Sequence, residues 1–273
     1  MSGRDIEGEV DKTPSKNVRV TGWKTGLLSV FVAALLTIGA LGPKITVYTI
    51  GDSTMAPYAL DNPRSQRGWG QVLQQFFTDD VQIIDAARGG RSSKSYYDEG
   101  LWKKVISEVQ PGDYVFIQFA HNDQKTDTAF HTEPWGEYTE YLKRYVSQTR
   151  EKGGIPVLFT PNVRRYFDST GHITPRGQHN MGPGDSVGNY PSAMRAVAKE
   201  MGVPLIDLTR NTKALVETYG PERSKELYIS TDKTHETILG ATLVARLAVD
   251  GLLEEHLDLG RYVDTSAAVF QHE

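Results

Sequence analysis

Three residues of this chain have side chains that could together activate a hydroxyl group. Ser53 stands in the segment GDST, directly after an apolar run, where an ordinary turn would also use these residue types. Asp232 and His235 are three residues apart, so a turn can place both side chains on one side. A serine hydroxyl is a weak nucleophile, and an imidazole oriented by a carboxylate is the base that it needs. The pattern predicts a Ser–His–Asp arrangement, although Asp232 and His235 would also suit a solvated turn.

Two other segments carry groups that suit a negative charge. Asn122 follows an apolar run, and its side-chain amide can donate to an oxyanion, although Asn-Asp is also common in turns. The segment GGRSS supplies Gly89 and Gly90, whose backbone N–H groups can face an anion or belong to a plain turn. Neither G-x-G-x-x-G nor G-x-x-x-x-G-K-[ST] is present, so a nucleotide-phosphate loop is not indicated.

A metal-dependent hydrolase is the alternative enzyme class. Its candidate ligands, which are residue types that suit zinc or manganese, are His121, Asp123, Asp232 and His235. The sequence has no H-E-x-x-H motif, and it has no cysteine, which excludes thiolate catalysis and disulfides. A Ser–His–Asp mechanism requires neither a metal nor an organic cofactor, and we expect none. A non-catalytic glycan-binding module is the alternative from a different class, and it would not require every position of the Ser–His–Asp pattern to be filled.

The elements that must position these residues show up as apolar runs alternating with amphipathic stretches of helical period. Such runs are typical of strands buried on both faces. They are Ile45–Ile50, Val81–Ala86, Tyr114–Ala120, Ile155–Thr160 and Val203–Leu208. The alternation predicts an α/β protein with one parallel sheet covered by helices on both sides. Ligands bind at the carboxyl ends of parallel strands, so the polar clusters that follow these runs are expected at one rim.

The N-terminal part of the 273-residue chain reads differently from the rest. Residues 25–42 carry no charge and follow several basic residues, a pattern typical of an export signal or an uncleaved anchor. Residues 1–24 are interpreted as a tail, residues 44–259 as one domain and residues 260–273 as a C-terminal tail. We expect an exported protein, periplasmic or extracellular, whose membrane contact is limited to residues 25–42.

The composition is that of an ordinary globular protein, with 38% hydrophobic and 23% charged residues. The formal net charge of -4 argues against a general electrostatic attraction to nucleic acid. We therefore expect no nucleic-acid partner. The oligomeric state cannot be read from the sequence.

Jointly, the segments IGDSTMA, ARGGRSSKSY, FAHNDQK and TDKTH resemble the four sequence blocks of the SGNH, or GDSL-type, hydrolases. They are most similar to the rhamnogalacturonan acetylesterase branch, and the resemblance covers residues 45–253. It implies a flavodoxin-like three-layer α/β/α sandwich with a five-stranded parallel sheet in the order 2-1-3-4-5. Two positions depart from the usual pattern: Ala120 stands where a glycine precedes His-Asn-Asp, and ETILGA follows His235 in place of the commoner FNEYGA type.

The resemblance also implies a role for each polar residue. Ser53 would be the nucleophile at a sharp strand-to-helix turn, His235 the general base and acid, and Asp232 the carboxylate that orients His235. The oxyanion hole would combine the Ser53 N–H, the Gly90 N–H and the side-chain amide of Asn122. The implied activity is a serine esterase that removes acetyl groups from plant cell-wall polysaccharide, most of all rhamnogalacturonan in pectin. An acetylxylan or general short-chain carbohydrate esterase is the alternative, because these residues contact the ester and not the sugar.

Recognition of an acidic sugar would favour arginine, because a guanidinium group binds a carboxylate through two parallel hydrogen bonds. Arg91 is the preferred candidate, since it directly follows Gly90 in the predicted oxyanion loop. The other loop arginines, which are also compatible with solvated surface positions, are Arg88, Arg164, Arg165 and Arg176. Sugar-ring platforms or core residues are the two interpretations for Trp69, Trp135 and Tyr166.

Overall fold

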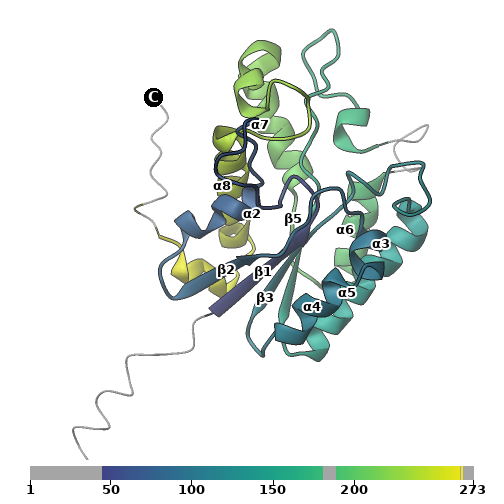
Figure 1. Ribbon diagram of the computed structural model, residues 1–273, viewed down its shortest axis with the longest axis vertical. Helices are drawn as coiled ribbons and strands as arrows, with labels where there is room; N and C mark the ends of the chain where they lie inside the picture. Colours follow the sequence, from purple (N-terminus) through teal and green to yellow (C-terminus); the bar gives the residue numbers. More distant parts are fainter. Residues whose placement is uncertain (1–44, 181–188, 265, 267–273) are drawn as a thin grey trace, which may run out of the picture. The chain divides into compact units, whose positions relative to one another are not determined.

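The computed structural model describes residues 45–180, 189–264 and 266. A five-stranded parallel sheet occupies its centre, in the order β2-β1-β3-β4-β5 (Figure 1). The strands are β1 (Ile45–Gly51), β2 (Val81–Asp85), β3 (Tyr114–Gln118), β4 (Ile155–Phe159) and β5 (Leu205–Ile206). The predicted α/β class and strand order are therefore confirmed, and β1 lies between β2 and β3.

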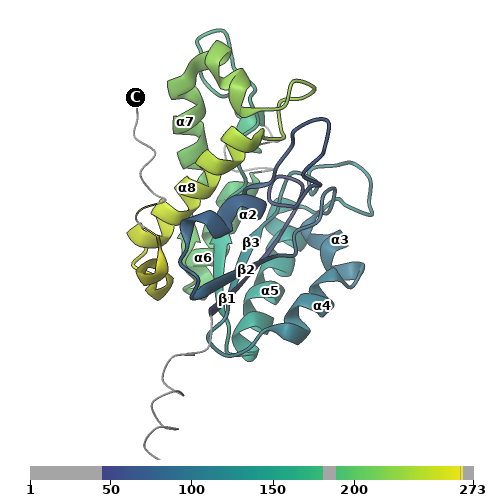
Figure 2. The same cartoon turned by 60° about the vertical axis from the view of Figure 1, so that its left-hand side comes forward.

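Helices cover both faces of the sheet. The α-helices are α2 (Trp69–Val72), α3 (Ser93–Asp98), α4 (Leu101–Glu108), α5 (Thr139–Glu151), α6 (Tyr190–Met201), α7 (Leu208–Arg223) and α8 (Ile238–Glu254). Shorter helical segments are η2 (Leu73–Phe76), η3 (Pro134–Tyr138), η4 (Arg176–Gln178), η5 (Ser224–Leu227) and η6 (Asp258–Tyr262). Figures 1 and 2 show α2 and α8 on one face and α3, α4, α5 and α6 on the other.

Two apolar cores follow from this arrangement because successive side chains of a strand point to opposite faces. Val47 of β1 belongs to the core beneath α2 and α8, whereas Ile50 belongs to the core beneath α3 to α6. Both side chains have no exposed surface. A strand buried on both faces needs apolar residues almost continuously. The apolar run at residues 45–50 therefore predicted β1 from the sequence alone.

The fifth strand is shorter than the sequence indicates. The run Val203–Leu208 was predicted as a strand, but only Leu205–Ile206 pair with β4. The Asp207 side chain accepts a hydrogen bond from the backbone N–H of Arg210, and this N-cap begins α7 directly after the strand. Helix α7 was not predicted, and its sequence does not divide into clear apolar and polar faces.

Backbone contacts continue past residue 259, where the sequence analysis places the start of a C-terminal tail. Segment η6 continues to Tyr262, and the backbone N–H of Thr78 donates to the Tyr262 carbonyl (2.9 Å). Val263 forms a bridge with Phe77, and the N–H of Asp264 donates to Phe76 (2.9 Å). Through these contacts, backbone groups of residues 262–264 find partners in residues 76–78, at the end of η2.

The predicted signal or anchor at residues 25–42 and the tail at residues 1–24 lie outside the described residues. Within the part of the chain that the structure describes, no helix is both long and apolar enough to cross a membrane. Export and anchoring therefore stay predictions from the sequence.

Candidate active site

The segment after β1 places Ser53 at the carboxyl end of the sheet. Gly51 allows this end of β1 to approach β3, since an added Cβ would lie 2.7 Å from the Gln118 carbonyl oxygen. The following turn is closed by the N–H groups of Met55 and Ala56, which both donate to the Asp52 carbonyl. The predicted strand-to-helix turn is thus a single turn of backbone, because the next helix, α2, begins only at Trp69.

Ser53, His235 and Asp232 form a continuous chain of hydrogen bonds. The Ser53 Oγ lies 2.9 Å from His235 Nε2, although the two residues are 182 positions apart. The His235 Nδ1 lies 2.8 Å from Asp232 Oδ2. The second carboxylate oxygen, Asp232 Oδ1, accepts the backbone N–H groups of His235 (2.8 Å) and Thr234 (2.7 Å). This turn fixes the carboxylate against the imidazole before any substrate binds.

The charge of Asp232 determines which nitrogen of His235 carries the proton. Partial burial opposes ionisation of Asp232, but the hydrogen bonds from His235 and Thr234 outweigh it and lower the pKa of the carboxyl. An ionised carboxylate only accepts hydrogen bonds, so Nδ1 of His235 must donate. Nε2 is then left as the acceptor that faces the Ser53 hydroxyl.

Backbone donors lie around Ser53 in the loop after β2. The N–H of Arg91 donates to the Arg88 carbonyl (3.3 Å) and closes a turn whose third residue is Gly90. Gly90 has a φ of +81°, which a type II turn requires at this position and which glycine adopts without strain. Within the described residues, the N–H groups of Ser53 and Gly90 donate to no protein acceptor. They are thus available to a negative charge in the cleft.

Asn122 adds a side-chain donor from the loop after β3. One hydrogen of its Nδ2 group donates to the Arg91 carbonyl (3.0 Å), which leaves the other for a ligand. The preceding Ala120 is fully buried with a φ of +149°, a region that favours glycine. The residue that departs from the usual glycine therefore occupies a backbone position where glycine would be unstrained.

Behind the loop, burial raises the pKa of Asp123 to about 7, although Ser93 and Thr132 donate to it.

The arginine selected from the sequence is turned away from the cleft. Arg91 donates through Nε to Glu99 Oε2 (3.0 Å) and through Nη1 to the Gly89 carbonyl (3.0 Å). Its guanidinium group thereby braces the Gly89–Gly90 turn, and it is not among the residues that line the cleft. Of the other loop arginines, Arg164 lines the cleft.

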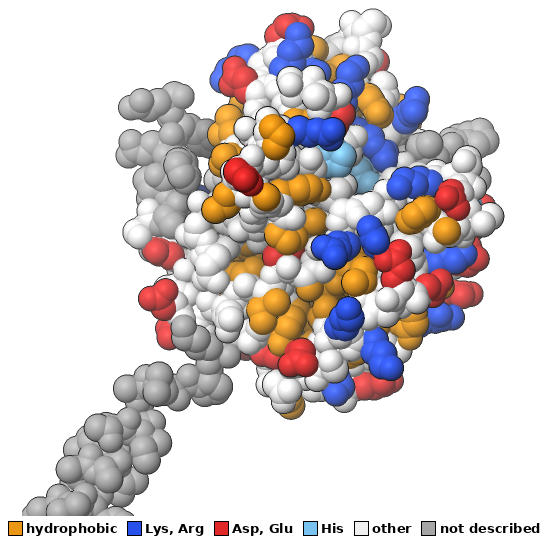
Figure 3. All heavy atoms as spheres, in the orientation of Figure 1, with side chains coloured by type: hydrophobic (Ala, Val, Ile, Leu, Met, Phe, Trp, Pro, Cys, Tyr) orange, Lys and Arg blue, Asp and Glu red, His pale blue; other side chains and the backbone are white. Residues whose placement is uncertain are grey.

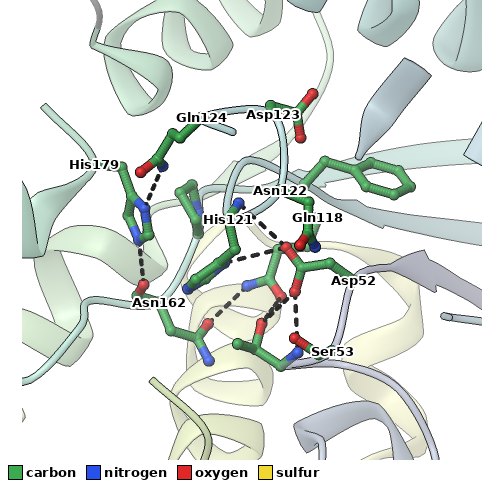
Figure 4. Close-up of polar contacts among 12 residues, drawn as sticks. Asp52, Ser53, Gln118, His121, Asn122, Asp123, Gln124, Asn162 and His179 are labelled. Carbon is green, nitrogen blue, oxygen red and sulfur yellow. Dashed lines mark hydrogen bonds and ion pairs between the residues drawn. The ribbon is translucent and has the colours of Figure 1, made fainter. Parts of the chain in front are cut away.

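A second Asp–His pair lies behind the first. Asp52 Oδ2 is 3.1 Å from His121 Nδ1, and both side chains are almost completely buried. Burial opposes ionisation of Asp52, but the neighbouring His121 and the bonds from Thr54 outweigh it and lower the pKa of the carboxyl. Burial also lowers the pKa of His121, although the Asp52 carboxylate opposes this shift. Figure 4 shows this pair with His179 and Asn162 continuing the polar network.

The cleft that contains Ser53 has a volume of about 530 Å³, which lies in the usual range for small-molecule sites. Two lining residues were not found from the sequence. Tyr58 donates its hydroxyl to the Ser53 carbonyl (2.8 Å) and so supports the turn of the serine from below. Gln66 lines the same cleft and bridges to Thr237 just after His235. Neither residue belongs to a recognisable motif, because its role comes from a contact across the fold.

The aromatic residues and the metal-ligand candidates from the sequence lie in different surroundings. Trp69 is fully buried and donates its indole N–H to Gln118 (2.9 Å), so it is a core residue. Trp135 is half exposed on η3, and Tyr166 lines a cavity next to the cleft. Among the residues described, no three His, Asp or Glu side chains converge in a way that would hold a metal ion. The Asp and His residues weighed as ligands instead enter separate hydrogen-bonded pairs.

The sequence of this chain is similar to those of known acyl hydrolases. The sequence model of the GDSL-like lipase/acylhydrolase family matches residues 49–241. A rhamnogalacturonan acetylesterase of Bacillus subtilis (strain 168) is 38% identical over 228 residues, which cover 79% of this chain and 92% of the relative. A probable rhamnogalacturonan acetylesterase of the same organism is 34% identical over 218 residues, which cover 78% and 94%.

Solved structures show the same fold. A Bacillus subtilis protein superposes with a TM-score of 0.67 at 28% identity, covering 79% of this chain and 58% of that protein. An acetylxylan esterase from Geobacillus stearothermophilus superposes with a TM-score of 0.58 at 16% identity, covering 78% and 95%. At that identity the second likeness concerns the fold alone.

Proposed function

This chain belongs to the GDSL-like lipase/acylhydrolase family and is a carboxylic ester hydrolase, and we propose from this premise that it deacetylates rhamnogalacturonan through Ser53. The coarser assignment, a carbohydrate acetylesterase, has the support of the two Bacillus subtilis relatives. The observation that carries the proposed chemistry is the 2.9 Å contact between Ser53 Oγ and His235 Nε2 beside unpaired N–H groups.

In the first half of the reaction, Ser53 Oγ attacks the carbonyl carbon of the acetyl ester. His235 Nε2 takes the hydroxyl proton, and Asp232 stabilises the imidazolium through Nδ1–H. The carbonyl oxygen becomes an oxyanion that accepts hydrogen bonds from the Ser53 N–H, the Gly90 N–H and Asn122 Nδ2. Collapse of the tetrahedral intermediate breaks the bond to the sugar oxygen, which leaves with the proton from His235.

In the second half, water replaces the sugar. His235 takes a proton from this water as it attacks the acetyl-Ser53 carbonyl, and the same donors hold the second oxyanion. The intermediate releases acetate, and Ser53 regains its proton from His235. Every proton is moved by the chain's own residues.

The choice of rhamnogalacturonan rests on the relatives with 38% and 34% identity, each matched over more than nine-tenths of its length. Acetylxylan is the second candidate, because the residues around Ser53 would contact the ester and not the sugar. Export is part of the proposal, since a cell-wall polymer is met outside the cell, and the uncharged segment at residues 25–42 supports it.

A direct comparison of substrates tests this proposal. Acetate release is measured with acetylated rhamnogalacturonan, acetylated xylan and p-nitrophenyl acetate at equal enzyme concentration. We expect the largest kcat/KM on acetylated rhamnogalacturonan. Faster release from xylan would overturn the substrate assignment while leaving the esterase chemistry intact, and failure to release acetate from any of the three would overturn the chemistry.

A further inference from the structure

The cleft around Ser53 continues into a second cavity of about 280 Å³, which we call the annex. Three residues, His121, Lys125 and Arg164, line both cavities, so the annex opens directly beside the serine. The remaining residues of the annex are Gln124, Tyr166 and Arg176. A chain of sugars with its ester at Ser53 would therefore extend into the annex.

The charge of this double cavity is one-sided. Its charged lining residues are Arg64, Lys125, Arg164 and Arg176, and no Asp or Glu of the described chain lines either part. The whole chain has a net charge of -4, so the positive lining is a local feature. In Figure 3 histidine side chains reach the surface near Lys and Arg side chains. A concave surface with one sign of charge concentrates ligands of the other sign.

Arg164 is the fixed member of this group. Its Nη1 donates to Gln124 Oε1 (2.8 Å) and lies 3.2 Å from His179 Nδ1, and its Nη2 donates to the His121 carbonyl (3.2 Å). Burial lowers the pKa of His179 well below its usual value, so this imidazole is neutral and brings no compensating charge. Figure 4 shows Gln124 and His179 in contact beside His121.

Arg164 has no ion-pair partner among the described residues. The nearby carboxylate of Asp52 is bound to His121. A half-buried guanidinium group that is held only by neutral acceptors loses hydration without gaining a counter-charge. Such a group is costly unless a ligand supplies the anion, and its remaining N–H groups are still free to donate to one.

At the outer wall of the annex, the ring of Tyr166 contacts Arg176 and a further cation, Lys233. The guanidinium carbon of Arg176 lies 5.4 Å from the centre of the Tyr166 ring, and Lys233 Nζ lies 5.7 Å from it. Cation–π contacts of this kind restrict long side chains that would otherwise be freely mobile. Tyr166 therefore keeps positive charge at the mouth of the annex.

From these observations we infer that the annex binds the carboxylate of a uronic acid unit at or near the acetylated position of the polysaccharide chain. Arg164 supplies the rigid donors, and Lys125 and Arg176 close around the same carboxylate. This inference rests on the proposed function, because it assumes that Ser53 attacks an ester on an acidic polysaccharide. It goes further in assigning the recognition of charge to the annex and not to Arg91.

The test compares two forms of one acetylated rhamnogalacturonan oligosaccharide, one with free carboxylates and one with the carboxylates methyl-esterified. Acetate release gives kcat/KM for each form. We expect the wild-type enzyme to prefer the free-acid form at least tenfold, with the difference mainly in KM. In Arg176→Gln and Lys125→Gln that ratio should fall several-fold toward one, because each variant removes a charge from the annex without removing a buried hydrogen bond.

The control is Arg223→Gln, which removes an arginine from an equivalent cation–π contact with Tyr219 (5.1 Å) on α7. It should keep the wild-type ratio. Arg164→Lys retains the charge but loses the fixed donors, so its ratio should fall between those of the wild type and Arg176→Gln. Equal kcat/KM on the two forms, with acetate still released from rhamnogalacturonan, would overturn the annex alone. Acetate release from xylan but not from either oligosaccharide would overturn the proposed substrate and the annex together.

Discussion

The two Asp–His pairs at the rim of the sheet have the same composition and opposite surroundings. In the outer pair, the side chains of His235 and Asp232 are 28% and 33% exposed, and the free imidazole nitrogen meets Ser53 Oγ at 2.9 Å. In the inner pair, the side chains of His121 and Asp52 are 3% and 0% exposed. Within the described residues, the buried Nε2 of His121 has no hydrogen-bond partner.

The difference shows that an Asp–His pair is defined by what its free nitrogen faces. The outer pair can pass a proton between a hydroxyl and a substrate because its Nε2 opens into the cleft. The inner pair joins Asp52, the residue before Ser53, to His121, the residue before Asn122. The backbone N–H of His121 also donates to Asp52 Oδ2 (3.3 Å). The inner pair therefore holds the nucleophile and the proposed oxyanion donor in one rigid unit.

The largest expected effect concerns Ser53, the residue that the outer pair faces. Ser53→Ala should lower turnover by about 10⁶, the scale on which loss of a nucleophilic serine acts. The free energy of unfolding should stay nearly constant, since the only side-chain hydrogen bond lost is to His235. Turnover is measured by acetate release, and Ser107→Ala, an exposed serine on α4, is the control. A Ser53→Ala enzyme with a tenth of the wild-type turnover would contradict the proposed nucleophile.

A matched pair of substitutions separates the two Asp–His pairs. His121→Phe should reduce the free energy of unfolding by about 3–5 kcal/mol, because it leaves the buried Asp52 carboxylate without its main partner. His235→Phe should change that free energy by less than about 1 kcal/mol, as for exposed pairs, while abolishing most of the turnover. Urea unfolding and acetate release are measured on both variants. Equal stability losses would show that burial does not distinguish the pairs.

The next effect concerns the donor that the inner pair holds in place. Asn122→Ala should raise the reaction barrier by about 2.7–4 kcal/mol, the range for one lost oxyanion donor. The loss should appear in kcat more than in KM, because the oxyanion exists only along the reaction path. Asn211→Ala on α7 is the control. A change confined to KM would make Asn122 a group that positions the substrate.

The last effect tests whether water reaches the region behind the two pairs. Burial raises the pKa of Glu236 to about 8, although Asn162 donates to its side chain. Since the folded protein holds this proton where the unfolded chain has released it, the contribution of Glu236 to stability is complete below the ordinary pKa of 4.5. It falls by about 1.4 kcal/mol per pH unit as the pH rises toward about 8.

Glu236→Gln keeps the shape of the side chain and removes this titration. The stability advantage of the variant over the wild type should therefore grow between pH 5 and pH 8, as measured by urea unfolding at each pH. Glu140→Gln, an exposed carboxyl on α5, should leave the wild-type pH dependence unchanged. A constant difference between Glu236→Gln and the wild type would mean that water reaches this carboxyl.

Much of the fold could be predicted from the sequence, because the residue patterns that indicate strands and helices are local. A strand buried on both faces must be apolar along its length, so the runs that become β1, β3 and β4 stand out against the amphipathic helices between them. Where local signals conflict, the structure differs from the predicted run, because Asp207 caps α7 and so shortens β5. The backbone pairing of Val263 and Asp264 with residues 76 and 77 also has no local signal in the sequence. Such pairings depend on distant partners.

The site divides in the same way. The residue types of Ser53, Asp232 and His235, and the turn chemistry around Gly90, are set by the sequence, since reactivity and backbone freedom belong to each residue. Only the tertiary structure decided which histidine meets the serine, because parallel strand order brings positions 53 and 235 together across 182 residues. It also turned Arg91 toward Glu99 and left Arg164 in the cleft without an ion-pair partner among the described residues. The direction of a long side chain depends on the charges that folding places around it, and these are not encoded in its own segment.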